Sequence, residues 1–502
     1  MFEGLVRFVR KLRAPGTVSG VLDEAEAGRR HVVLPPLLLA LGEFHARQTL
    51  EVRPAVRALL LHLDDVAGGT PTRRWTTQLD EHLAQAGRAA VLAELPPWLE
   101  LIDVEACRFS PALPKGLVWA SRTLDGEVVA RLLGALAERA DRKVPGRGPM
   151  SRGVVNACLK VLGELDSDAG VAQLTRLKGV IEYREAHQQL DRAFAGAASK
   201  RELSVDELED QVVPDVAGLT APIGVWTPSI TFDDGAPVLG WVRDDGRRTR
   251  RVPAELQRDH ADAVNERKAR FSEFEEVLEA QAHRLERLFW TQRAMPLAAF
   301  RQHTLSHPVV SLLARALVWT VGDRPALWFD DAFVDAAGQV FDADPGAAVR
   351  LWHPALADDE AVATWRARLA ALELTQPFLQ VERPVFSLTE SERAGGVTRR
   401  WEGRRLRQQR LHVMCRRRQW QATRLEPGQA DAVVRVVEPW AMQVLLEVLA
   451  DGDETTASQA ATWLRTGALR LSREAGLEAL SPVVASEVLY EVDAIVRGSE
   501  AG

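Results

Sequence analysis

The segment that organises this chain is LTQPFLQVERPVFSLTESERAGGVTRRWEGRRLRQQRLHVMCRRRQW, residues 374–420. It combines polar, aromatic and basic side chains more densely than any other part of the sequence. Pro377 and Pro384 forbid a continuous helix in its first part, so extended backbone is expected there. A short helix is predicted to begin at Thr389, with Glu392 three residues later in the capping-box position, and to end at the following pair of glycines.

A second helix is predicted over the basic part of this segment, from Arg399 to Arg418. Leu406, Val413 and Met414 have the spacing of one apolar helix face. Two interpretations of the arginines stay open. They form a surface for phosphate or nucleic acid, which guanidinium groups and interleaved aromatic rings suit, or they pair with carboxylates from the rest of an acidic chain.

The two parts of the segment are expected to fold back on each other and form one ligand-binding or partner-binding surface. The hypothesis rests on amide, guanidinium and aromatic side chains, which are suited to binding an anion or a protein partner. The candidate site residues are Gln376, Phe378, Gln380, Arg383, Trp401, Arg404, Arg407 and Gln408.

Several motifs of the chain, taken in order, resemble the MolR-like family of bacterial proteins. The matching pieces include His307-Pro308, the run from Arg350 to Pro354, Gln376-Pro377-Phe378 and Arg400-Trp401-Glu402-Gly403. The resemblance implies a C-terminal domain of unknown function, the one numbered 4132. Such proteins are often encoded beside MoxR-type AAA+ ATPases and von Willebrand A-domain proteins. These two classes are therefore the protein partners that the resemblance implies.

Composition restricts the class of protein. The chain has 502 residues, 46% of them hydrophobic, and a formal charge of −7, with a pI near 6.0. This balance argues against a surface built entirely for nucleic acid or anionic lipid. Cys107, Cys158 and Cys415 form no CxxC pair, so a reducing, cytoplasmic location is expected. The most apolar run, residues 31–42, is too short to span a bilayer, and no membrane association is expected.

The expected fold is mostly α-helical, with an α+β C-terminal domain. Four regions are expected: an N-terminal segment 1–30, a helical region 31–202, an α+β MolR-like domain 203–498 and a disordered tail 499–502. Within the helical region, two stretches read as α-α hairpins resembling HEAT repeats, one from Lys115 and one from Asn156. Stacked hairpins would form a short solenoid. An ordinary helical bundle is the alternative interpretation.

Within the α+β domain, a pattern of strands and turns is expected first, at residues 222–253, because Asp-Asp-Gly turns separate alternating runs there. A long amphipathic helix is predicted at 254–293. A small antiparallel sheet is expected at 327–353. Residues 457–472 predict a further helix.

No catalytic signature is recognisable, and no cofactor or metal is expected. There is no G-x-S-x-G elbow and no kinase signature set. His303 and His307 share a helical spacing, yet the glutamate of a zincin is missing and Pro308 follows, so a capping or core role is expected for His307. The favoured function is a non-catalytic adaptor or regulatory protein. The alternatives are a nucleic-acid or anionic-ligand binding protein using the Arg399–Arg418 helix, and an enzyme of unrecognised class.

Overall fold

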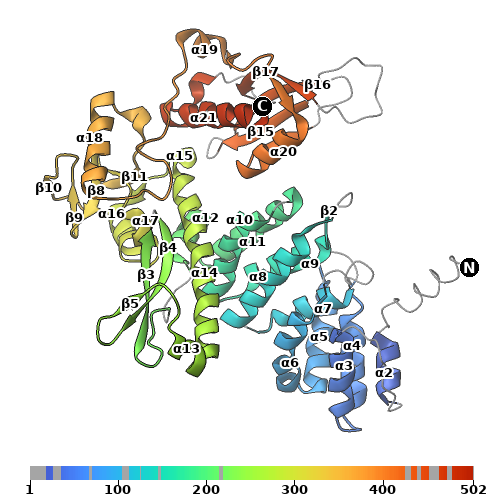
Figure 1. The fold of residues 1–502 in the computed structure, drawn as a ribbon. Coiled ribbons are helices and arrows are strands. Elements are labelled where there is room, and N and C mark those ends of the chain that lie inside the picture. Colours follow the sequence, from blue (N-terminus) through green and yellow to red (C-terminus); the bar gives the residue numbers. More distant parts are fainter. Residues whose placement is uncertain are drawn as a thin grey trace, which may run out of the picture. The chain divides into compact units, whose positions relative to one another are not determined.

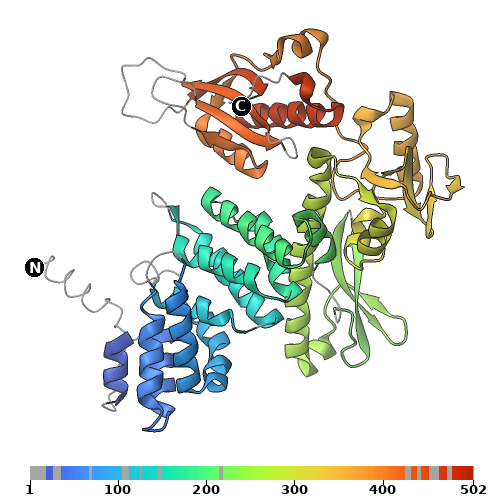
Figure 2. The same ribbon diagram turned by 180° about the vertical axis from the view of Figure 1, so that it is seen from behind.

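The computed structural model places the chain in two compact units, Met1–Pro214 and Asp215–Gly502, which are described separately. Figures 1 and 2 show the fold from opposite sides. The structure describes residues 18–26, 36–66, 70–103, 112–124, 126–144, 148–181, 183–213, 219–233, 235–423, 431–437, 442–450, 463–471 and 477–500. Most of the expected N-terminal segment and the last two residues lie outside these ranges.

The first unit consists of helices and one short hairpin. The helices are α2 Val18–Glu26, α3 Pro36–Arg47, α4 Arg53–Leu63, α5 Arg73–Ala86, α6 Arg88–Glu100, α7 Ala112–Ser121, α8 Glu127–Asp141, α9 Arg152–Glu164, α10 Asp168–Val180, α11 Arg184–Lys200 and α12 Val205–Gln211. Strands β1 Lys143–Val144 and β2 Gly148–Pro149 pair between α8 and α9. The stretch from Asn156 forms α9 and α10, which pack together. The stretch from Lys115 forms α7 and α8, which both pack on α9 rather than mainly on each other.

One apolar core joins the helices of the first unit, and small residues let them approach closely. The buried cluster runs from Val18 to Val212 and includes Trp119 and Phe194. At Gly116 of α7, an added Cβ would lie 2.0 Å from the backbone oxygen of Leu63 at the end of α4. Any larger side chain would therefore force these two helices apart.

The second unit begins with the expected strands. β3 Trp226–Asp233, β4 Ala236–Arg243 and β5 Arg248–Thr249 form an antiparallel sheet. The helix predicted at 254–293 is divided into α13 Ala254–Asp259, α14 Ala261–Glu286 and α15 Leu288–Thr291. The division after α13 falls at His260, whose backbone leaves the helical region with φ −139° and ψ 36°. No proline or glycine signals this break in the sequence.

A six-stranded antiparallel sheet follows, larger than the one expected at 327–353. Its order is β10-β9-β8-β7-β11-β6. The strands are β6 Met295–Pro296, β7 Trp319–Val321, β8 Arg324–Phe329, β9 Ala332–Val334, β10 Val340–Phe341 and β11 Ala348–Leu351. Helix α18, Asp359–Ala371, packs on it through Val362, Trp365 and Leu369, which share a buried cluster with Trp352 and Val381.

The chain ends in a second six-stranded sheet, called the second sheet from here on, of order β12-β17-β16-β15-β14, with β13 also paired to β17. The strands are β12 Val397–Thr398, β13 Arg405–Arg407, β14 Gln421–Thr423, β15 Asp431–Val437, β16 Met442–Ala450 and β17 Trp463–Leu471. Helices α20 Gln408–Arg417 and α21 Pro482–Ser499 lie side by side (Figure 1). Both also pack against β13. The second unit is thus α+β, and the first is helical, as expected.

Two helix predictions in this region are wrong. Residues 457–472 were predicted as a helix, but Trp463–Leu471 form strand β17, whose backbone pairs with β16 on one side and with β12 and β13 on the other. The predicted helix Arg399–Arg418 begins only at Gln408, because Arg405–Arg407 pair with β17 as strand β13. In both places strand pairing with distant residues overrides the local helical pattern.

No helix in the described part of the chain is long and apolar enough to cross a membrane.

Candidate functional site

The glutamines of the candidate site bond to the chain's own backbone. Gln380 is fully buried, and its Oε1 accepts the N–H of Val318 at 2.8 Å. Its Nε2 donates to the carbonyl oxygens of Val318 at 2.6 Å and Trp352 at 2.9 Å. The side-chain amide thus ties together the chain before β7 and the chain after β11. Gln380 is a structural residue, because a buried amide with satisfied partners has little left to offer a ligand.

Gln376 belongs to the same hydrogen-bond network as Gln380. Its Nε2 donates to Ala316 O at 3.0 Å and to Gln380 Oε1 at 2.7 Å, while its Oε1 accepts the N–H of Val381 at 2.9 Å. Phe378 lies nearby, edge-on to Phe289 with ring centroids 5.8 Å apart. Gln376 and Gln380, in the stretch that Pro377 interrupts, therefore hydrogen-bond to the backbone beside the six-stranded sheet that contains β7 and β11.

Arg383 lies in a buried ion-pair network. Its Nε donates to Glu487 Oε1 at 2.9 Å, its Nη2 bonds to Glu487 Oε2, and its Nη1 donates to Glu286 Oε1 at 2.6 Å. The guanidinium carbon lies 4.6 Å from the ring centroid of Tyr490. Glu286 ends α14 and Glu487 belongs to α21, so one guanidinium group joins the two helices.

His353 completes this network from the end of β11. It is fully buried, and its Nδ1 accepts the N–H of Ala355 at 2.9 Å. That bond requires Nδ1 to be unprotonated, so the ring proton of a neutral His353 is on Nε2 and is donated to Glu487 Oε1 at 3.1 Å. Glu487 is thus the shared acceptor of an arginine and a histidine.

Burial and hydrogen bonding act in opposite directions on these charges. Burial opposes ionisation of Glu487, but the hydrogen bonds from Arg383 and His353 outweigh it, so the pKa of this carboxyl lies below its usual range. Burial also opposes the charge of Arg383, and the bonds from Glu487 outweigh it, so its pKa lies above its usual range. Both groups stay charged at neutral pH, and the pair is a buried salt bridge.

Two tryptophans of residues 374–420, called the motif segment from here on, also bond to α21. Trp401 Nε1 donates to Asp493 Oδ1 at 3.1 Å. Trp420 Nε1 donates to Glu491 Oε2 at 2.6 Å, and Arg435 of β15 donates to the same oxygen at 2.6 Å. Burial raises the pKa of Glu491 despite this pairing. Helix α21 therefore supplies the carboxylate acceptors for both tryptophans.

The sequence analysis missed the carboxylates that hold these residues. Glu487 and Glu491 lie one helical turn apart within PVVASEVLYEVDAIV, and Asp493 follows. Acidic residues at this spacing inside an otherwise apolar helix were the available signal, because a charge is buried only with a partner. Nothing in the local sequence indicated that the partners lie about a hundred positions earlier in the chain.

The remaining candidate residues lie elsewhere, in or directly next to strand β13 of the second sheet. Arg404 is exposed, and its Nε lies 3.1 Å from Glu500 Oε1. Arg407, the last residue of β13, is exposed with its guanidinium carbon 5.1 Å from the ring centroid of Trp463. Gln408 begins α20 and is half-buried. The structure thus divides the eight candidates between an internal network and a sheet surface, and does not gather them in one pocket.

His303 and His307 do not form a metal site with their neighbours. His307 Nδ1 accepts the N–H groups of Val309 at 3.1 Å and Val310 at 3.3 Å, which is the expected capping role. Within the ranges that the structure describes, no three side chains of His, Cys, Asp or Glu are placed to share a metal ion.

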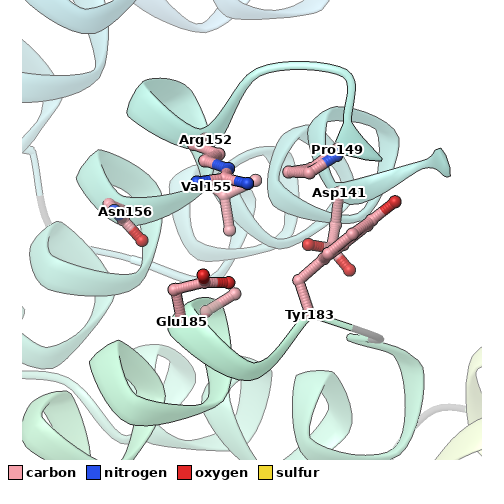
Figure 3. Close-up of a pocket in the computed structure, with 8 residues that line it drawn as sticks. Asp141, Pro149, Arg152, Val155, Asn156, Tyr183 and Glu185 are labelled. Atoms are coloured by element: carbon pink, nitrogen blue, oxygen red, sulfur yellow. The ribbon is translucent and has the colours of Figure 1, made fainter. Parts of the chain in front are cut away.

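A small cavity lies in the first unit, between the ends of α8, α9 and α11 (Figure 3). Its lining includes Asp141, Arg152, Asn156, Tyr183 and Glu185. Its volume is about 20 Å³, which is enough for a water molecule. Pockets for metabolites are typically about 300 Å³ or larger, so this cavity does not fit a metabolite.

Fold and site together define a helical unit linked to an α+β unit whose motif residues are mainly structural. Residues 246–420 match the family model described as a domain of unknown function (DUF4132). The match covers the long helix, the six-stranded sheet and the motif segment. It supports a domain of unknown function in the C-terminal part of the chain. No curated protein matches the chain, and no solved structure matches it.

Proposed function

We propose that this chain is a non-catalytic adaptor or regulatory interaction protein. The observation that carries the proposal is the use of the polar motif residues. Gln376, Gln380 and Arg383 bond to backbone and carboxylates of the chain itself, whereas Arg404 and Arg407 lie on an exposed sheet surface. Gln376, Gln380 and Arg383 therefore do not share a pocket with Arg407, so the enzyme hypothesis that depended on such a pocket has no support. An exposed surface, by contrast, is suited to binding a macromolecular partner.

The finer parts of the proposal come from the sequence resemblance. The chain would be a MolR-like protein, its helix pairs would act as a HEAT-like scaffold, and its partners would be a MoxR-type AAA+ ATPase and a von Willebrand A-domain protein. A cytoplasmic location belongs to the same proposal, because the chain has only three cysteines and no CxxC pair.

The test is complex formation with purified partners. The full chain is mixed with the MoxR-type ATPase and the von Willebrand A-domain protein of its own source, and the mass of the eluting species is measured by light scattering during size exclusion. A stable complex at about 10 µM is expected, since regulatory interfaces commonly have micromolar or tighter affinity. Elution of every component alone at that concentration would overturn the assignment of these partners.

A second candidate, an anionic-ligand or nucleic-acid binding protein, is favoured by one observation. Arg405 and Arg407 lie beside Trp463 on the sheet surface. Binding of duplex DNA would weaken steeply with salt, with a slope of about −0.9 per phosphate contacted. A flat salt dependence, or no binding at low salt, would remove this candidate.

A further inference from the structure

Helix α20 has one side in the interior of the second unit and one side on its surface. It packs against α21 and against the neighbouring strands β13 and β14. Leu411 and Cys415, one helical turn apart, are 2% and 3% exposed on the inner side. At Gly498 of α21, an added Cβ would lie 2.5 Å from the Cε of Met414, so the two helices approach closely. The inner side of α20 is therefore filled by the chain's own residues.

The outer side of α20 carries two arginines with a valine between them. Arg410, Val413 and Arg417 are all exposed, the valine at 46%. Residues separated by three and by seven positions lie on one face of an α-helix, because each residue adds about 100° of rotation. These three side chains therefore form one row along the helix surface, which we call the α20 stripe.

The stripe keeps its positive charge, whereas arginines before the helix are paired with carboxylates of the chain. Those pairs are Arg399 with Glu402, Arg400 with Glu392 and Arg404 with Glu500. Arg410 instead donates from Nη1 to the backbone carbonyl oxygen of Glu500 at 2.8 Å. Among the described residues, no carboxylate pairs with Arg410 or Arg417. Two positive charges thus flank Val413, roughly 10 Å apart along the helix axis.

Arginines that flank an exposed aliphatic side chain are suited to binding an acidic amphipathic helix. An apolar residue of such a helix would cover Val413, and carboxylates about two turns apart would reach the guanidinium groups of Arg410 and Arg417. Helices pack through rows of this kind, in which the side chains of one row lie in the groove beside the facing row. The charge and the spacing of the stripe are therefore complementary to such a partner.

The same region is less suited to nucleic acid. Trp401 and Trp420, which flank α20 in the sequence, are 5% and 3% exposed, so neither offers an open ring on which a base could stack. The half-buried ring of Trp463 already has the guanidinium carbons of Arg405 and Arg407 at 4.3 Å and 5.1 Å from its centroid. A sugar-phosphate backbone also has no apolar side chain to cover an exposed valine.

We propose that the α20 stripe docks an acidic amphipathic helix of a partner protein. An apolar residue of that helix packs against Val413, and its carboxylates bind Arg410 and Arg417. This inference rests on the proposed adaptor function and names the surface and the chemistry that the partner would use.

The experiment measures peptide binding to the full chain by fluorescence anisotropy. The probe is a labelled peptide of about 15 residues in which Glu and Leu are spaced to form an acidic amphipathic helix, long enough to lie along α20. Three comparison probes are used: the same residues in scrambled order, the peptide with Lys in place of Glu, and a duplex DNA of about 15 base pairs.

The variants separate the charges of the stripe from its apolar centre. The charge-reversed variant is Arg410→Glu with Arg417→Glu, the neutral variant has Gln at the same two positions, and Val413→Asn tests the apolar contact. The matched control is Arg73→Glu with Arg74→Glu, the same charge change on exposed residues of helix α5. Unaltered circular dichroism of each variant, together with a graded effect in the neutral variant, separates a lost contact from a misfolded chain.

The acidic peptide is expected to bind the unchanged chain and the control equally, with a Kd of about 10 µM or lower. Charge reversal should weaken binding about tenfold or more, the neutral variant by an intermediate amount, and Val413→Asn a few-fold, because charge and apolar contact both contribute. The scrambled and lysine peptides should bind at least about tenfold more weakly. Bound peptide should slow hydrogen exchange at residues 408–417.

Four results would overturn the docking surface. The first is equal peptide affinity in the charge-reversed variant and the unchanged chain, and the second is absence of peptide binding at about 100 µM. The third is equal binding of the scrambled peptide, which would indicate charge attraction without a docked helix. The fourth is duplex DNA binding that is tighter than peptide binding and is abolished by the same reversal, which would assign the stripe to nucleic acid.

The complex with the purified partners is a separate measurement. If the charge-reversed chain still forms that complex, the adaptor function stands and only this surface is lost. If the unchanged chain binds the acidic peptide but forms no complex, the assignment of the partners is lost and the surface stands.

Discussion

At the scale of single residues, buried polar side chains hold the C-terminal unit together. The Gln380 side-chain amide bonds to the backbone of Val318 and Trp352, at the adjoining ends of β7 and β11. Glu487 accepts bonds from Arg383 and His353 in the interior. Removing one partner of such a network leaves the others buried without a bond, which is more costly than the net gain of the bond itself.

Replacing Glu487 with Gln is expected to destabilise the chain by about 3 kcal/mol at pH 7, because the buried Arg383 would lose the carboxylate that its Nε and Nη2 contact and keep only Glu286. The loss should depend on pH. Since folding lowers the pKa of Glu487, its stabilising contribution is complete above the unfolded value of about 4.3 and fades as the pH falls below it. Urea denaturation at pH 7 and at successively lower pH values measures both effects.

The matched control is Glu382→Gln, at an exposed carboxylate 2.9 Å from the exposed Arg366. An exposed pair contributes less than about 1 kcal/mol, so this variant should stay close to the unchanged chain. Similar losses in the two variants, or a difference for Glu487→Gln that stays constant as the pH falls, would contradict the role assigned to Glu487.

At the scale of elements, local capping signals were reliable and apolar patterns were not. The S/T-x-x-E patterns at Ser204, before α12, and at Thr389, before α19, Glu390–Gly395, form capping boxes. These signals depend only on neighbouring residues. Strand β17 lacks such a signal, and its neighbours in the sheet decide its conformation.

The cap of α19 provides a prediction at this scale. Thr389→Ala removes the side-chain oxygen that accepts the N–H of Glu392, a loss of about 1 kcal/mol. Hydrogen exchange at residues 390–395 should then become about fivefold faster. Arg400 holds Glu392 from the other side and keeps its pKa at about 2, so the charge of the cap persists.

Thr364→Ala is the control for this experiment, since Thr364 is exposed within α18 and caps no helix. Exchange in α19 should be the same as in the unchanged chain. An unaltered exchange rate of α19 in Thr389→Ala would show that Arg400 alone holds the start of the helix.

At the scale of the whole molecule, the two units have separate cores. The apolar cluster of the first unit begins at Val18 and ends at Val212, and it contains none of the residues that the structure describes in the second unit. A domain with its own core can fold alone. A fragment of residues 1–214 is therefore expected to be helical by circular dichroism and to unfold in one cooperative thermal transition.

A fragment ending at residue 180 is the comparison. It lacks α11, whose Leu190 and Phe194 are fully buried in that cluster, so it should lose the cooperative transition. A fragment of residues 1–214 that unfolds gradually would show that the first unit depends on the rest of the chain.

The sequence by itself determined the elements whose causes are local. Composition and periodicity predicted a helical first part and an α+β second part, and turn and capping residues predicted β3–β4 and α19. The sequence also indicated Arg383 and Trp401 as candidate site residues. Each of these features follows from residues within a few positions of one another.

Only the tertiary structure decided what the motif residues do. Trp352, Glu487 and Glu491, which bond to Gln380, Arg383 and Trp420 respectively, lie 28 to 104 positions away from them, and a single chain carries no local sign of pairings so distant. The same is true of β13 and β17, whose pairing turns a predicted helix into the edge of a sheet and brings Arg407 beside Trp463. Burial and strand register are properties of the folded chain, so the surface and the network became distinguishable only in three dimensions.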